Sequence, residues 1–213
     1  MTDIAIIDYG MGNLGSVAKA IEWVAPQSEV VITQDPAVLA AADRVVFPGQ
    51  GAMPDCMREL AARGLREAVL DAAASKPFLG ICLGLQMLFD YSEEGDVAGL
   101  GILPGKVMRF PTQPVCKVSG RPLKVPHMGW NKVAQTDPSH PMWAGIDNDE
   151  RFYFVHGYYV APENAATDAA YTEYGLRFTS GVTQANIFAT QFHPEKSAQA
   201  GLQLLANFVR WNP

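Results

Sequence analysis

Short apolar runs alternate with helical stretches through the first hundred residues, and this alternation restricts the fold more than any other feature. The apolar runs span residues 3–10, 28–35, 43–49 and 76–82. The helical stretches span residues 15–25, 55–75 and 83–92, and Gly64 is a candidate break in the second. Because short strands separated by helices pair in parallel through right-handed crossovers, we expect an α/β fold with a mostly parallel, doubly wound sheet flanked by helices.

The second half of the chain has a different sequence pattern. Residues 99–110, 151–162 and 187–195 are strand-like and are separated by segments rich in turn residues. These segments favour antiparallel strands added to the sheet, and residues 197–211 read as a closing amphipathic helix. With no repeat and no linker, we expect a single domain over residues 1–213.

Composition excludes several classes of function. The chain is 48% hydrophobic with a formal charge of −6, which disfavours non-specific nucleic-acid binding. No apolar segment approaches the roughly 20 residues that span a bilayer, and Asp3 precedes the first apolar run where a signal peptide has basic residues. The 3 cysteines lack CxxC spacing, so we expect neither a disulfide framework nor a metal site, and a cytoplasmic location.

A glycine-rich turn follows the first predicted strand. Residues 10–15 read GMGNLG and match GxGxxG between a strand and a helix, and Asp35 lies about 20 residues further on. That context is required of a dinucleotide site, but any tight turn between a strand and a helix can carry such glycines. The motif leaves both interpretations open.

A second glycine pair surrounds a cysteine. Gly80 and Gly84 flank Cys82 where the fourth predicted strand meets a helix, the setting of a nucleophile elbow. The helix N-terminus would favour the thiolate, and the N–H of Leu83 would be free to stabilise an oxyanion. The alternative is that Cys82 is a small buried hydrophobic residue.

A cysteine nucleophile needs a base, and His193 is the best of the 4 histidines. It ends an apolar strand, and Glu195 lies two residues later, on the same side of an extended chain. Pro194 biases His193 away from helix. An exposed strand end with an incidental acid is the alternative for this pair alone. Both motifs fall at the carboxyl ends of strands, where sites gather in open α/β sheets.

A third segment belongs to the same edge of the predicted sheet. Gly49, Gln50 and Gly51 end the third strand, next to the elbow strand in a simple doubly wound order. Glycines there let the backbone approach a ligand and turn an N–H inward, as a second oxyanion donor. An ordinary glycine-rich turn explains the residues equally well.

The segments GICLGLQ, HPEKS and PGQG resemble the class I (triad) glutamine amidotransferases. This resemblance implies that Cys82 attacks the side-chain amide of glutamine, with His193 as acid and base and Glu195 orienting it. Gln86, one helical turn beyond Cys82, is a candidate to bind glutamine, and the resemblance adds Glu94 and Tyr158. Nothing in the family binds NAD, so the resemblance makes the first glycine turn a shape feature and implies no cofactor.

Within this family, the chain resembles the glutaminase subunits of imidazole glycerol phosphate synthases. The likeness is carried by DYGMGNL, PHMGWN and FVHGYY, and by Leu85, where several related amidotransferases have histidine. It implies a heterodimer with a (β/α)₈-barrel cyclase subunit, which receives the ammonia. Trp130 could be an interface anchor or a core aromatic residue. The predicted interface residues are Asn13, Met128, Trp130, Asn131 and Lys132.

Three other readings remain open at this point. The chain could be the glutaminase subunit of another amidotransferase. It could be a stand-alone cysteine hydrolase with the same triad, which would be active without a partner. It could also be a non-catalytic nucleotide-binding module built on residues 10–15, in which case Cys82→Ala would leave function intact.

Overall fold

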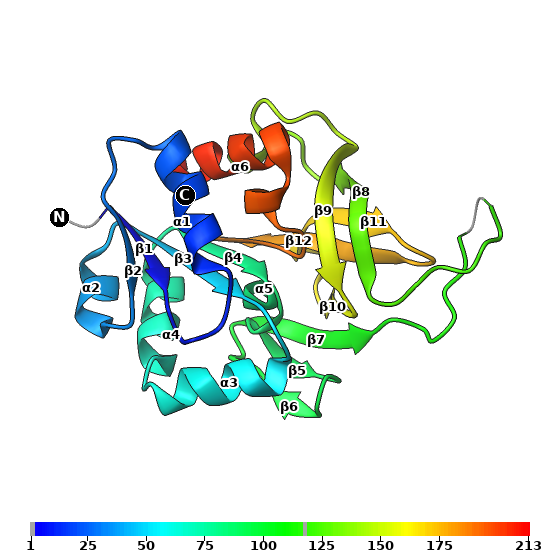
Figure 1. Cartoon of the computed structure of the whole chain (residues 1–213), viewed down its shortest axis with the longest axis horizontal. Helices are drawn as coiled ribbons and strands as arrows, with labels where there is room; N and C mark the ends of the chain where they lie inside the picture. The colour runs from blue at the N-terminus through cyan, green and yellow to red at the C-terminus, as the bar shows by residue number, and fades with distance from the viewer. Residues whose placement is uncertain (1–2, 117–118) are drawn as a thin grey trace.

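A computed structural model describes residues 3–116 and 119–213 of the chain. Its centre is a parallel sheet of five strands that lie side by side (Figure 1). Their order in the sheet differs from their order along the chain. Each neighbouring pair among them is parallel. In spatial order the strands are β2 (Val30–Thr33), β1 (Ile4–Ile7), β3 (Arg44–Gly49), β4 (Phe78–Cys82) and β13 (Ile187–Thr190).

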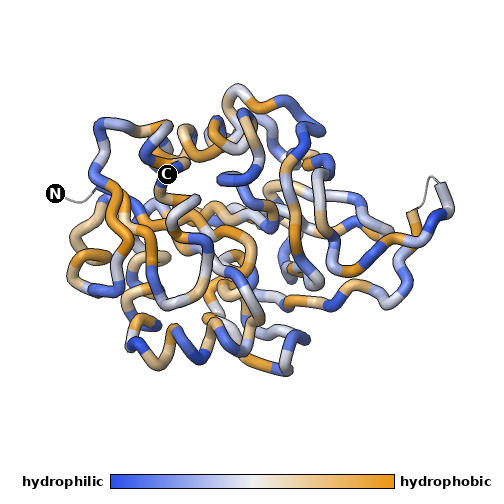
Figure 2. Tube along the Cα trace, viewed as in Figure 1, coloured by the Kyte–Doolittle hydropathy of each residue, from blue (hydrophilic) through white to orange (hydrophobic). Residues whose placement is uncertain are grey.

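The four parallel strands β1, β3, β4 and β13 are buried on both faces, whereas β2 lies at the edge of the sheet, and the buried side chains divide between two apolar clusters. In β1, Ile4 and Ile6 belong to one cluster, whereas Ala5 and Ile7 belong to the other, as the alternation of a pleated strand requires. These strands are hydrophobic along their length, unlike the outer helices (Figure 2). The doubly wound sheet that the sequence predicts is therefore confirmed.

Helices cover the two faces of this parallel sheet (Figure 1). The face with Ile4 and Ile6 packs against residues of α1 and α6, and the opposite face against residues of α2, α3 and α4. Gly64, at φ +65°, separates α3 from α4 and confirms the predicted break. The helices are α1 (Leu14–Val24), α2 (Pro36–Ala41), α3 (Met53–Ala62), α4 (Arg66–Ser75) and α6 (Ala198–Arg210).

The second half of the chain extends the sheet, mainly with antiparallel strands, as predicted. Next to β13 come β12 (Arg177–Gln184), β10 (Tyr158–Pro162), β7 (Leu103–Arg109), β5 (Phe89–Ser92) and β6 (Val97–Ala98). A branch through β12 adds β11 (Asp168–Glu173), β8 (His127–Gln135) and β9 (Glu150–His156). Short 3₁₀ helices are η1 (Pro141–Trp143), η2 (Ala165–Thr167) and η3 (Pro194–Lys196).

The predicted helix over residues 83–92 is wrong beyond its first turn. Helix α5 spans only Leu83–Gln86, and Phe89–Ser92 form strand β5 instead. Phe89 pairs with Leu103 of β7, and Tyr91 pairs with Ala98 of β6. Residues 83–89 are all buried, so their continuous apolar pattern fits a helix and a strand equally well, and the pairing with β7 decides.

Among residues 3–116 and 119–213, no helix is both long enough and apolar enough to cross a membrane.

Candidate active site

The turn from β4 into α5 forces Cys82 into an unusual backbone conformation. Its φ is +55° and its ψ −108°, which costs a non-glycine residue about 1–3 kcal/mol and is typical of functional turns. The neighbouring glycines make the turn possible: a Cβ on Gly80 would lie 2.8 Å from the Cβ of Ala189, and one on Gly84 would overlap the carbonyl oxygen of Phe47. The strand-to-helix elbow predicted from the sequence is present.

His193 and Glu195 lie together at the end of the neighbouring strand. His193 Nδ1 donates to Glu195 Oε1 over 2.8 Å, and both side chains are almost completely buried. The contact between the two side chains is as predicted, but the backbone between them is not an extended strand. Strand β13 ends at Thr190, and Glu195 lies in the 3₁₀ helix η3 that begins after His193. Pro194 occupies the first position of that helix, where its fixed φ is favourable.

The backbone of His193 is fixed from two sides. Its N–H donates to the carbonyl of Tyr153 over 2.9 Å, and its carbonyl accepts from the hydroxyl of Ser197 over 2.6 Å. Ser197 Oγ in turn accepts from the N–H of Tyr153. Strand β9 and the segment after η3 therefore hold the imidazole in place, which a catalytic base requires.

The charges around His193 decide its protonation state. Burial opposes a positive charge on the ring, but the negative charge of a Cys82 thiolate and the Glu195 carboxylate outweigh burial and raise the pKa of His193 to about 10. Because Nδ1 of His193 donates its hydrogen bond to Glu195, the proton that His193 can transfer is the one on Nε2. That atom is buried and has no hydrogen-bond partner among the described residues.

Cys82 and His193 line one cavity of about 250 Å³. Leu83, Gln50 and Gly51 line it as well, so three of the predicted oxyanion residues share this cavity with Cys82. Gly49 does not line it; it pairs with Cys82 in the register of β3 and β4, where a Cβ would lie 2.8 Å from that of Leu83. Gly51 has a φ of +107°, so the turn depends on glycine there.

The three predicted glutamine-binding residues, Gln86, Glu94 and Tyr158, also line this cavity. Gln86 is buried, and its amide nitrogen donates to the carbonyl of Tyr158 over 3.1 Å. Glu94 Oε2 accepts from the N–H of Met53, at the start of α3, over 2.9 Å. The site thus brings together a cysteine, a histidine–glutamate pair and polar groups around one small cavity.

The sequence reasoning missed Gln191. This fully buried side chain donates from Nε2 to Cys82 Sγ over 3.8 Å and accepts from Gln86 over 2.9 Å at Oε1. Its position two residues before His193 was the available signal. His156 lines the cavity too.

The glycine turn at residues 10–15 does not have the geometry of a dinucleotide site. The third glycine of that fingerprint allows close packing of helix on strand, yet a Cβ on Gly15 would meet nothing within 4 Å. Asp35, the acid expected to bind a ribose, instead caps α2 by accepting from the N–H of Ala37 over 2.8 Å. The geometry favours the ordinary turn.

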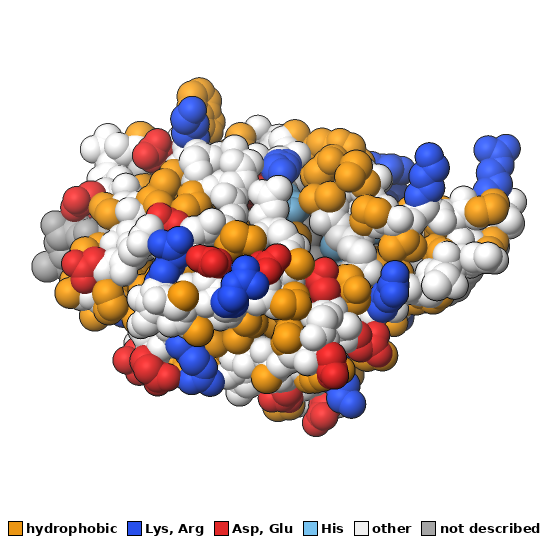
Figure 3. Space-filling view, turned by 60° about the horizontal axis from the view of Figure 1, so that its bottom comes forward, with side chains coloured by type: hydrophobic (Ala, Val, Ile, Leu, Met, Phe, Trp, Pro, Cys, Tyr) orange, Lys and Arg blue, Asp and Glu red, His pale blue; other side chains and the backbone are white. Residues whose placement is uncertain are grey.

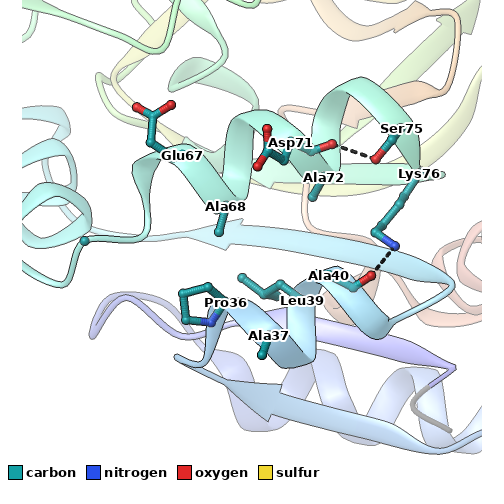
Figure 4. Close-up of a pocket in the computed structure, with 11 residues that line it drawn as sticks. Pro36, Ala37, Leu39, Ala40, Glu67, Ala68, Asp71, Ala72, Ser75 and Lys76 are labelled. Atoms are coloured by element: carbon teal, nitrogen blue, oxygen red, sulfur yellow. Dashed lines mark hydrogen bonds between the residues drawn. The ribbon is translucent and has the colours of Figure 1, made fainter.

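A second cavity, of about 540 Å³, lies between α2 and α4 (Figure 4), and Cys82 is not among the residues that line it. Pro36, Leu39, Ala68 and Ala72 line much of it, and Lys76 closes one end by donating to the carbonyl of Ala40 over 2.8 Å. It contains no histidine or cysteine, so it offers no nucleophile and base for the chemistry described above.

Four of the five predicted interface residues lie on β8, and their side chains point to its two sides. Met128 and Trp130 are 63% and 48% exposed on alternate positions of β8, and Lys132 continues the same side. Trp130 is therefore not a core aromatic residue. Asn131 points the other way, donating to the carbonyl of Glu173 and to His127. Figure 3 shows a face where hydrophobic side chains gather near histidine atoms.

Asn13, the remaining predicted interface residue, precedes α1 on the carboxyl side of β1, the edge of the sheet that carries Cys82. It is half-buried, and its side chain makes no capping hydrogen bond to the helix.

Fold and site together define a class I glutamine amidotransferase. A model of the family described as glutamine amidotransferase class-I matches residues 5–211, and the chain belongs to this family. A crystal structure of a glutamine amidotransferase has the same fold, with a TM-score of 0.71, 16% identity and coverage of 97% of both chains. The chain is thus a glutamine amidotransferase.

Curated relatives identify the branch of the family. The chain is 70% identical over 213 residues to imidazole glycerol phosphate synthase subunit HisH of Aromatoleum aromaticum, covering 100% of both chains. It is 63% identical to the subunit of that name from Nitrosospira multiformis, again over 100% of both. At this identity and coverage the chain belongs to the HisH subunit family.

Proposed function

We propose that this chain is the glutaminase subunit of an imidazole glycerol phosphate synthase in histidine biosynthesis, acting through Cys82, His193 and Glu195. It hydrolyses L-glutamine to glutamate and delivers the ammonia to a cyclase subunit. The observation that carries the residue assignment is the convergence of Cys82 and the His193–Glu195 pair on one small cavity. The whole chain, residues 1–213, acts as one amidotransferase domain in the cytoplasm.

The first half of the reaction forms a thioester. The Cys82 thiolate attacks the amide carbon of glutamine, and the negative charge moves to the former carbonyl oxygen. The N–H of Leu83 and an N–H of the turn at residues 49–51 hold that oxyanion. His193, kept positively charged beside the thiolate and Glu195, donates its Nε2 proton to the leaving nitrogen. The C–N bond breaks and ammonia departs.

The second half regenerates the enzyme. His193, now neutral, takes a proton from water through Nε2, and the hydroxide attacks the thioester carbon. The same N–H groups hold the second oxyanion. When the C–S bond breaks, glutamate leaves and Cys82 returns to its starting state. Gln86, Glu94 and Tyr158 hold the α-amino and α-carboxylate groups of glutamine, which need polar partners in the cavity.

The size of the cavity supports a small substrate. At about 250 Å³ it lies below the range of roughly 300–1,000 Å³ that is typical of pockets for drug-sized ligands. That volume suits an amino acid and disfavours a peptidase acting on a folded chain.

A partner subunit completes the proposal. Ammonia released into water is protonated and ceases to be a nucleophile, so the chemistry requires a partner docked over the cavity. We assign that role to a (β/α)₈-barrel cyclase subunit, which uses the ammonia on a phosphoribosyl nucleotide to make imidazole glycerol phosphate and aminoimidazole carboxamide ribotide. The docking residues would be Met128, Trp130 and Lys132, with Asn13 and Asn131 beside them.

The test measures glutamate release by the wild type and by Cys82→Ala, with and without the cyclase subunit and its nucleotide. We expect partner-dependent turnover in the wild type and none in Cys82→Ala. The control replaces glutamine with an ammonium salt: the Cys82→Ala pair should then make both products at the wild-type rate. Glutamine hydrolysis by Cys82→Ala would refute the mechanism, and full activity without a partner would favour a stand-alone hydrolase.

A further inference from the structure

A chain of hydrogen-bonded polar groups, most of them buried, starts at strand β8 and runs toward the cavity. Asn131 Nδ2 lies 3.3 Å from His127 Nε2, and His127 Nδ1 lies 2.9 Å from His156 Nε2. His156 Nδ1 then donates to the carbonyl oxygen of Tyr158 over 2.7 Å. His127 and His156 are cross-strand partners on β8 and β9, so PHMGWN and FVHGYY meet at this pair.

The chain continues from Tyr158 to the nucleophile. Gln86 Nε2 donates to the same Tyr158 carbonyl over 3.1 Å and to Gln191 Oε1 over 2.9 Å. Gln191 Nε2 donates to Cys82 Sγ over 3.8 Å. An unbroken series of hydrogen bonds therefore connects Asn131, on the proposed docking strand, with Cys82.

The Tyr158 carbonyl fixes the direction of every bond in this series, because a carbonyl oxygen only accepts. His156 must therefore carry its proton on Nδ1, which leaves Nε2 as an acceptor. His127 in turn must donate from Nδ1 and accept at Nε2 from Asn131. On the other side, Gln86 uses both amide hydrogens, one on Tyr158 and one on Gln191.

The two imidazoles are suited to hold this arrangement. Both are buried, and burial lowers the pKa of His127 to about 4 and that of His156 to about 3. Both rings are thus neutral near pH 7, which the direction of the bonds requires. His127 is also stacked between Phe154 and Tyr174, with ring centroids 4.8 and 3.9 Å away. A broken bond here would leave a buried polar atom unsatisfied, at about 1–3 kcal/mol.

We propose that His127 and His156 are positioning residues that tie strand β8 to the glutamine pocket. By holding the Tyr158 carbonyl they fix the Gln86 amide, so that Gln86 can present only its oxygen Oε1, an acceptor suited to the α-ammonium group of the substrate. A partner that moves β8 thereby acts on substrate binding. The identity of the substrate and of the partner rests on the proposed function. The directions of the hydrogen bonds do not depend on it.

The first experiment is therefore independent of activity. Side-chain ¹⁵N NMR of the histidine-labelled chain at pH 7 should show His127 and His156 both neutral, each with its proton on Nδ1. His127→Phe and His156→Phe assign the two signals. A proton on Nε2 of either ring, or a charged ring, would contradict the bond directions and overturn the proposal even if the chain is an active glutaminase.

The second experiment measures glutamine kinetics with saturating cyclase subunit and nucleotide. His127→Phe keeps the ring stacking but removes both hydrogen bonds, and we expect the KM for glutamine to rise about tenfold, with kcat changing less. His127→Asn keeps a donor near the position of Nδ1 and should restore most of the affinity. The matched control is His140→Phe, because His140 is half-buried between Phe188 and Trp211 and is not among the residues that line the cavity.

The outcomes separate positioning from general damage. If His127→Phe is folded and keeps the wild-type KM, or if His140→Phe raises KM equally, the proposal is wrong. If His127→Phe does not fold, the tautomers of the wild-type chain decide. An inactive wild type with the expected tautomers would remove the proposed function and leave the hydrogen-bond series in place.

Discussion

At the scale of single residues, the state of His193 depends on its two neighbours. Burial alone would keep the ring neutral, but Cys82 and Glu195 reverse this and raise the pKa of His193 to about 10. In the proposed mechanism, the imidazole then has a proton to donate to the leaving nitrogen at neutral pH. Glu195 therefore does two things: it fixes the ring through Nδ1 and helps to keep it charged.

Glu195→Gln should separate these contributions. The amide still reaches Nδ1, but the negative charge is gone, so the pKa of His193 falls. We expect kcat for glutamine hydrolysis to drop about 10³-fold and the alkaline limb of the kcat/KM profile to move to lower pH. Steady-state assays from pH 6 to 10 measure both. Glu67→Gln, an exposed residue on α4, should change neither, and an unshifted limb in Glu195→Gln would contradict the role of the charge.

At the scale of elements, local patterns predicted the parallel strands and the elbow because their signals are local. Gly80, Gly84 and the buried run before Cys82 report directly on a tight turn out of a central strand. The signal failed at residues 89–92, where an apolar run is compatible with two structures and a distant strand, β7, decides. Likewise, the position of Gln191 two residues before His193 is only a weak signal, because its contact with Cys82 depends on β13 lying beside β4.

The elbow also requires that α5 lies close to β3, and a substitution of Gly84 tests this requirement. A Cβ there would overlap the carbonyl of Phe47, so the backbone of β3 must move. We expect Gly84→Ala to lower the free energy of unfolding by about 3 kcal/mol or more. Urea denaturation measures this.

The matched control is Gly15→Ala, because a Cβ at this position of α1 meets nothing within 4 Å. It should be neutral or stabilise the chain by up to about 1 kcal/mol, since alanine favours helix. Equal destabilisation by the two substitutions would contradict the close approach of α5 to β3.

At the scale of the whole molecule, the groups of interest gather on one side. Cys82, the turn at residues 49–51 and Asn13 all lie at or beyond the carboxyl ends of parallel strands, where open α/β sheets place their sites. The antiparallel half contributes β9 and β10, whose residues Val155–Tyr158 complete the cavity wall. Strand β8 pairs with β9 and presents Met128 and Trp130 outward. The cavity and the exposed apolar residues are thus one strand apart.

This arrangement predicts which tryptophan anchors the partner. Trp130 is 48% exposed and packs its ring edge-on against Tyr153, so it can be buried further at little cost in side-chain freedom. We expect Trp130→Ala to weaken binding of the cyclase subunit by about 2 kcal/mol, a rise in Kd of about 30-fold. Titration calorimetry measures the Kd directly.

Trp23 provides the control for this prediction. It is 77% exposed near the end of α1, at the opposite end of that helix from Asn13. Trp23→Ala removes a similar apolar area from a part of the surface that faces away from the cavity, so the Kd should stay within about twofold of the wild type. If Trp23→Ala weakened the complex as much as Trp130→Ala, the partner would have to dock away from β8, and ammonia would have no short path from Cys82 to it.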